Sequence, residues 1–160
     1  MIAFIVFNVT SCSQRISNEE KAEEFLKIVL TAPDKEISNL VNSNLAQENK
    51  KEFNSKMNGA LQKLCEDYVS ESKSSDASSQ LIQNILMYHS MASMNGEKYI
   101  VKEVKITTSG NDNNFSYEAS IESDLDDESF IIKGNIQFDD DGYIDYLIIP
   151  FENTPTLQNV

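Results

Sequence analysis

Residues 99–149 read YIVKEVKITTSGNDNNFSYEASIESDLDDESFIIKGNIQFDDDGYIDYLII, and this stretch decides the fold. It contains four runs typical of β-strands, separated by short breaks rich in turn-forming residues: Tyr99–Thr108, Phe115–Ser123, Phe130–Phe138 and Tyr143–Ile149. The last break contains Asp141-Gly142, a pair that tolerates the positive φ of a tight turn. We therefore predict four successive strands joined by hairpins into an antiparallel sheet.

The predicted strands indicate which side of the sheet is buried. The second alternates apolar residues (Phe115, Tyr117, Ala119, Ile121) with polar ones, and the first and third follow a similar pattern. One face should therefore be covered by helices while the other faces water. The fourth strand is apolar on both sides, which predicts a central or doubly covered position.

The residues before the sheet have helical periodicity. Ser17 and Glu20 match a capping box at the start of a predicted amphipathic helix over residues 18–30. Further helices are expected over 34–42, 45–69 and 81–92, with an exposed loop at Ser70–Ser79. We expect the long helix to line the apolar face of the sheet. Its residues Phe53, Leu61, Leu64 and Tyr68 would then contact Phe115, Tyr117, Ile132 and Ile136.

Composition and charge limit the class of protein. The chain has 160 residues, enough for one domain with a sizeable core, which we place at 18–151 and follow with a loose tail at 152–160. Its formal charge is −13; from Glu97 onward, 14 acidic residues against 4 lysines give −10. Such a surface repels nucleic acid and anionic lipid, so a nucleic-acid partner is excluded. The negative charge does not exclude cations or a basic protein as partners.

The N-terminus has the layout of an export signal. An apolar run at Ile2–Phe7 leads into Val9-Thr10-Ser11-Cys12, which resembles the lipobox of bacterial lipoproteins. The resemblance implies a signal peptide at 1–11, a tether at 12–17, and a lipid on the sulfur of Cys12 that holds the protein at the extracytoplasmic face of the cell membrane. The alternative is that these residues form the first strand of a cytosolic protein.

The order of the elements, helices first and then an antiparallel meander, predicts the α+β class. It resembles the cystatin-like and nuclear-transport-factor-2-like cone folds, in which a curved sheet wraps around a helix. Many small lipoproteins of Gram-positive bacteria, and the extracytoplasmic assembly domain of type IV secretion systems, are similar. This fold hosts both enzymes and binding modules, so the resemblance leaves function open.

Few residues suit catalysis or metal binding. His89 could act as a general base in a pocket of the cone, together with Tyr117 and a carboxylate such as Asp145. However, His89 shares its helix stripe with apolar residues, which favours a core position. Cys65 lies among apolar helical positions and is interpreted as a buried small residue.

The acidic turns do not form a recognisable metal site. Aligning Gly142 with the sixth position of an EF-hand places Gln137 at the first ligand and Ile148 at the twelfth, where carboxylates are needed. Asp139–Asp141 is therefore interpreted as a hairpin turn, and a weak calcium contact at Asp124–Glu128 is the lesser alternative. We expect no cofactor.

These observations favour a lipid-anchored, extracytoplasmic binding module that is not an enzyme. Its partners would be the membrane, through Cys12, and another envelope protein or a small ligand. The alternatives are a subunit of an envelope or conjugative type IV secretion assembly, and a cone-fold enzyme that uses His89.

Overall fold

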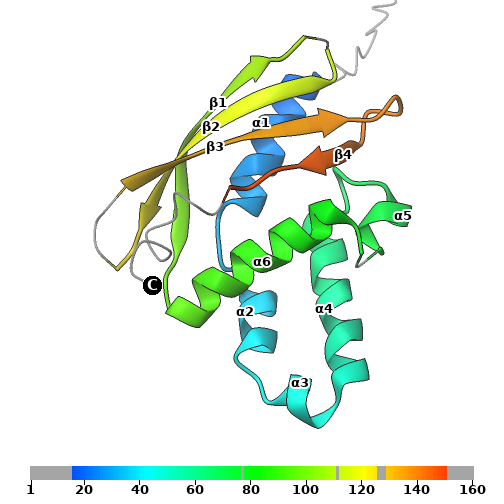
Figure 1. The fold of residues 1–160 in the computed structure, drawn as a ribbon, viewed down its shortest axis with the longest axis vertical. Coiled ribbons are helices and arrows are strands. Elements are labelled where there is room, and N and C mark those ends of the chain that lie inside the picture. Colours follow the sequence, from blue (N-terminus) through cyan, green and yellow to red (C-terminus); the bar gives the residue numbers. More distant parts are fainter. Residues whose placement is uncertain (1–15, 77, 111, 126–128, 151–160) are drawn as a thin grey trace, which may run out of the picture.

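The computed structural model describes residues 16–76, 78–110, 112–125 and 129–150 (Figure 1). Within these residues, helices precede a four-stranded sheet, which confirms the predicted α+β class. The helices are α1 (Asn18–Val29), α2 (Lys35–Val41), α3 (Leu45–Glu48), α4 (Lys50–Cys65), α5 (Glu71–Ser74) and α6 (Gln80–Asn95), and the strands are β1 (Tyr99–Thr108), β2 (Asn114–Ser123), β3 (Ser129–Phe138) and β4 (Ile144–Leu147).

The sheet is an antiparallel meander in the order β1-β2-β3-β4, as the alternating pattern predicted. It is open and curved, which is consistent with a cone-like fold (Figure 1). The buried side chains of β2 are those predicted, because each alternate residue points to the helical side. β4 is shorter than expected, and it lies at an edge of the sheet and pairs with β3 alone, so the prediction of a central position is wrong.

The capping box at the start of α1 is confirmed. The Ser17 hydroxyl accepts the Glu20 N–H at 3.2 Å, and the Glu20 carboxylate accepts the Ser17 N–H at 2.9 Å. The helix predicted over 45–69 is wrong as one element, because the backbone of Asn49 leaves the helical region (φ −149°, ψ 83°) and divides α3 from α4. The predicted loop at 70–79 contains the short helix α5.

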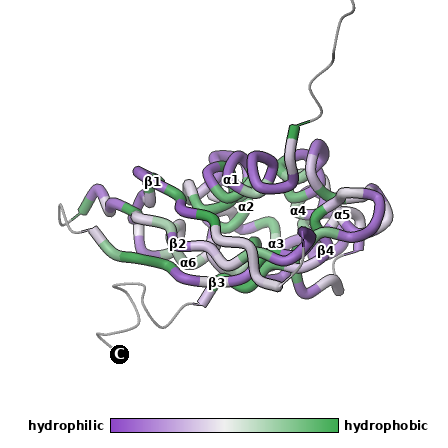
Figure 2. The backbone as a smooth tube through the Cα atoms, turned by 90° about the horizontal axis from the view of Figure 1, so that it is seen from above, coloured by the Kyte–Doolittle hydropathy of each residue, from purple (hydrophilic) through white to green (hydrophobic). Residues whose placement is uncertain are grey.

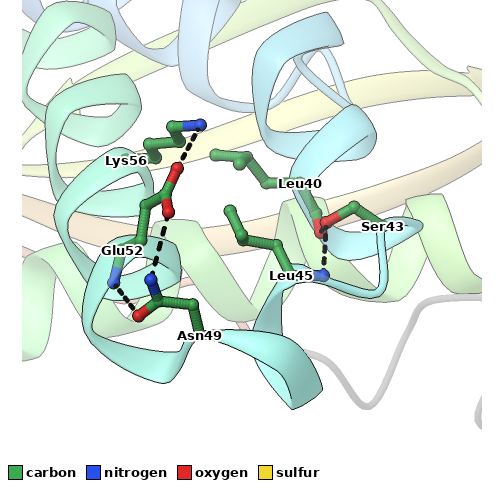
Figure 3. A network of polar contacts seen from close by, with 6 residues as sticks. All are labelled: Leu40, Ser43, Leu45, Asn49, Glu52 and Lys56. Atoms are coloured by element: carbon green, nitrogen blue, oxygen red, sulfur yellow. Dashed lines mark hydrogen bonds and ion pairs between the residues drawn. The ribbon is translucent and has the colours of Figure 1, made fainter.

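Side chains stabilise the corner where α2, α3 and α4 meet (Figure 3). The Ser43 hydroxyl donates to the Leu40 carbonyl at 2.7 Å and accepts the Leu45 N–H at 3.3 Å. Asn49 caps α4, since its Oδ1 accepts the Glu52 N–H at 3.2 Å and its Nδ2 donates to Glu52 Oε2 at 3.1 Å. Asparagine at such a position competes with the helix for backbone hydrogen bonds, which explains the break.

The helix that covers the sheet is not the predicted one. α1 packs against β1 and α6 packs against β4, whereas α4 packs chiefly against the other helices. Figures 1 and 2 show α1 as a layer behind the strands. Phe53, Leu64 and Tyr68 are accordingly only partly buried, while Leu61 belongs to the core. Both α1 and α4 have an apolar stripe, and periodicity alone does not show which of the two helices packs against the sheet.

Tyr117 and Gly134 form a cross-strand pair on the buried face of the sheet. The Tyr117 ring occupies the space over Gly134, and its hydroxyl donates to the Ile148 carbonyl at 2.7 Å. A Cβ at position 134 would lie 2.7 Å from that ring and 2.3 Å from the Ile148 carbonyl oxygen. The glycine is therefore required for the chain after β4 to approach β3.

Gly134→Ala is expected to lower the free energy of unfolding by about 1–3 kcal/mol, since the methyl group overlaps a backbone oxygen. Gly59→Ala in α4 is the matched control: nothing lies within 4 Å of its Cβ position, and alanine favours the helix by about 1 kcal/mol. Urea denaturation of both variants measures the difference. Equal stability of the two variants would contradict the close approach at Gly134.

Candidate functional site

His89, the candidate base, lies in the core on the inner side of α6. Its side chain is fully buried and bridges to the segment that joins α1 to α2. Nδ1 accepts the backbone N–H of Asp34 at 2.8 Å, and Nε2 is 3.0 Å from the Val29 carbonyl oxygen. Because Nδ1 is the acceptor, Nε2 must carry the proton and donate it to Val29.

This environment keeps the imidazole neutral. Burial lowers the pKa of His89 to about 4, against the opposing influence of the Val29 carbonyl and the Asp34 carboxylate. Both ring nitrogens are occupied by backbone groups, so neither is available to a bound molecule. His89 therefore holds three elements together, which fits the apolar helix stripe on which the sequence places it.

Tyr117 and Asp145 have other partners. Tyr117 is buried, its hydroxyl donates to the Ile148 carbonyl, and burial raises its pKa. Asp145 forms an ion pair with Lys73, which also donates to the Asp145 carbonyl at 3.3 Å. His89, Tyr117 and Asp145 thus each bond to different residues. None of these contacts brings the three side chains of the predicted pocket together.

Cys65 is a free thiol buried in the core, as predicted. Burial raises the pKa of its thiol to about 12, so it stays protonated and is a poor nucleophile near neutral pH. Cys12, the predicted lipidation site, lies outside the described residues, as does the signal segment before it.

The acidic turn between β3 and β4 is organised by its own side chains. Asp139 Oδ1 accepts the N–H groups of Asp141 at 3.0 Å and Tyr143 at 2.9 Å, and Gly142 has a φ of +79°. Lys21 of α1 donates to the Gly142 carbonyl at 3.2 Å. The hairpin interpretation is confirmed. Among the described residues, no group of three or more His, Cys, Asp or Glu side chains is placed to hold a metal ion.

The structure shows surface hollows that sequence reasoning missed. One of about 500 Å³ lies between α4 and α5, and another of about 450 Å³ lies on the sheet. The first is lined by Gly59, Gln62, Lys63, Glu66, Val69, Glu71 and Ser74. Gly59 is the sequence signal that points to it, because a glycine inside a helix lowers its stability without an evident local reason.

The hollow on the sheet combines residues from three strands. It is lined by Lys105, Thr107, Ser116, Tyr117, Glu118, Lys133, Gly134 and Asn135, so Tyr117 is the one member of the predicted pocket that it contains. Lys133 and Glu118 form an ion pair at 2.7 Å. Both hollows offer charged and amide groups of the kind that orient a polar ligand or a peptide.

No protein-family model matches the chain, and no curated protein sequence matches it. Among solved structures, a de novo designed β-sheet protein determined by solution NMR is similar: it shares 14% sequence identity, the alignment covers 86% of this chain and 91% of that one, and the TM-score is 0.45. At this level the likeness carries no argument about function. None of the helices in the described ranges is long and apolar enough to cross a bilayer.

Proposed function

We propose that this protein is a lipid-anchored binding module on the extracytoplasmic face of the cell membrane, and that it works without catalysis. The observation that carries the proposal is the position of His89, whose two ring nitrogens are both bonded to backbone groups in the core. The one histidine of the chain thus serves the fold, which weighs against an enzyme that uses it as a base.

The hollow between α4 and α5 is the binding surface that the geometry favours. Gly59 leaves the backbone of α4 open to close approach, since nothing lies within 4 Å of its Cβ position. Lys63, Glu66 and Glu71 offer charges of both signs beside it. These groups suit a peptide segment, so another envelope protein is the favoured partner, with a small polar ligand as the second choice. The charge of −13 disfavours nucleic acid.

The anchor follows from the lipobox-like Val9–Cys12 and from its spacing to the domain. From Cys12 to Ser17 the chain advances five residues, a reach of at most about 18 Å. A lipid on Cys12 would thus hold the first turn of α1 near the membrane. Asp139–Asp141, which line a hollow with Asn18 and Lys21, would lie at the same end of the domain.

Cys12→Ala is expected to release the protein from the membrane or to leave it unprocessed, because the sulfur that takes the lipid is lost. The measurement is cell fractionation followed by mass determination of the recovered chain. Cys65→Ala is the matched control, since it removes the buried thiol instead and should leave the protein in the membrane fraction. Wild-type protein found in the cytosol with Met1 retained would refute the anchor.

A further inference from the structure

The two edges of the sheet differ in how their backbone groups are bonded. At the edge formed by β4, the Ile144 N–H donates to the Tyr68 carbonyl at 2.8 Å. The Leu147 carbonyl accepts from the side chain of Asn84 in α6 at 2.8 Å. Helix α6 packs against this strand (Figure 1), so the fold itself uses the backbone groups of the β4 edge.

The edge formed by β1 is bonded at its start alone. There the Tyr99 N–H donates to the Ala32 carbonyl at 2.6 Å, and the Tyr99 carbonyl accepts the Ala32 N–H at 3.0 Å. Beyond this bridge, no hydrogen bond joins the outer side of β1 to any other residue that the structure describes. Most of this edge is therefore open.

Antiparallel pairing decides which residues face the open edge. The Ser109 N–H donates to the Asn114 carbonyl at 2.7 Å, so the backbone of Ser109 faces β2. Successive residues of a strand turn their backbone groups to opposite sides. Back along β1, Thr108, Ile106 and Val104 therefore direct their N–H and C=O groups away from β2.

The core side of the sheet is also covered less completely at β1 than at β2. Tyr117 and Ala119 of β2 are buried, and their cross-strand partners on β1 are Ile106 and Val104. Ile106 is only partly buried, and Thr108, further along the same row, is exposed. A strand added at this edge would continue the row and would cover Ile106 with an apolar side chain.

A row of outward N–H and C=O groups on an extended chain is matched by another extended chain, which satisfies donors and acceptors alike. We propose that the open edge of β1 binds, as an antiparallel fifth strand, an extended segment of a basic partner protein in which apolar and polar residues alternate. Its apolar residues would face the core side beside Ile106. The charge of −13 attracts a basic segment and repels a second copy of this chain.

The irregular start of β1 limits the length of the site. The pairing of β1 with β2 shifts between Val101 and Glu103, so regular pairing at the open edge is confined to Val104–Thr108. Lys105 forms an ion pair with Glu103 at 3.4 Å, which reduces its repulsion of a basic segment. For so short a strand we expect a dissociation constant between about 10 µM and 1 mM. The site is separate from the lipid anchor and from the hollow between α4 and α5.

The probe for this site is the heptapeptide Lys-Val-Thr-Val-Thr-Val-Lys, blocked at both ends and titrated into the isotope-labelled full-length protein. Binding should shift the NMR signals of β1, and at about 2 mM peptide it should slow hydrogen exchange of the Ile106 and Thr108 N–H groups at least about threefold. In an antiparallel pair the valine nitrogens face β1. Methylation of these nitrogens should therefore abolish binding, whereas the matched peptide methylated on its threonine nitrogens should bind as the parent does.

Ile106→Pro tests the same contact from the side of the protein. It removes an outward N–H without removing a bond to β2, so it should weaken peptide binding at least about tenfold. Ile106→Ala is the matched control, because it keeps the N–H and should weaken binding less than about threefold. Cooperative urea unfolding shows that both variants are folded, and the methylated peptides test the wild type independently of them.

Four results would overturn the proposal. The peptide would fail to bind at about 2 mM, or its signal shifts would lie at the hollow between α4 and α5 instead of β1. Equal binding of the peptide methylated on valine would show that attraction between charges, and not strand pairing, holds it. Association of the wild type through β1 in the absence of peptide would show that a second copy covers the edge.

Discussion

Phe25→Ala should lower the free energy of unfolding by about 3–5 kcal/mol, the largest effect that we expect from a single side chain. Phe25 is fully buried on α1, the helix that packs against β1. Its ring lies 5.4 Å from that of Tyr68, so the substitution removes an aromatic contact together with apolar burial and leaves a cavity. Urea denaturation followed by circular dichroism measures the change.

The control for this prediction is an exposed position on the same helix. Ile28 is 37% exposed, so Ile28→Ala should change the stability by less than about 1 kcal/mol. A loss from Phe25→Ala no greater than that from Ile28→Ala would show that Phe25 is not buried in the core as the structure has it. The same experiment with Leu64→Ala compares the contribution of α4 to stability with that of α1. Leu64 is only partly buried, so the loss of stability should lie between those of Phe25→Ala and Ile28→Ala.

The second large effect is a pH dependence that depends on His89. Its pKa is about 4 in the folded protein, compared with 6.5 for an exposed histidine. Between these values the unfolded chain binds a proton that the folded chain does not. Stability is therefore fully present above pH 6.5 and is lost as the pH falls toward 4, by about 3 kcal/mol in total.

The measurement is the free energy of unfolding at several pH values, compared between the wild type and His89→Gln. The variant has no group that titrates at this position, so its stability should fall less steeply between pH 6.5 and about 4. Carboxylates such as Glu20 and Glu118 have lowered pKa values, and they contribute acid sensitivity equally to both proteins. Parallel pH curves would show that His89 is not held neutral in the core.

Glu118 and Tyr117 are neighbours on β2, and they differ in burial. The carboxylate of Glu118 faces water and pairs with Lys133 across the strands, a contact that salt screens. Tyr117, the next residue back along β2, is buried and bonded to the chain after β4. Neighbouring positions on one strand thus differ in how much they contribute to stability. The alternation of apolar and polar residues along the strand reflects this difference.

The amino-acid sequence by itself determined the local elements. Alternation placed the strands, and β1 has the bounds that were expected; the capping box placed the start of α1, and Asp141-Gly142 placed the last turn. These features depend on residues close together in the chain, so their energetics are visible in a short window. The burial of His89 and Cys65 was likewise predicted from their apolar neighbours on a helix.

Which helices cover the sheet was decided by the tertiary structure alone. An apolar stripe shows that a helix side needs a partner but does not name it, so α4 was predicted to line the sheet where α1 and α6 do so. The same limit separated His89, Tyr117 and Asp145, whose partners Val29, Ile148 and Lys73 lie far from them in sequence. It also left the exposure of Met87 and Met94 on α6 undecided, because sequence periodicity reports the apolar residues of a helix and not which of them the fold leaves exposed.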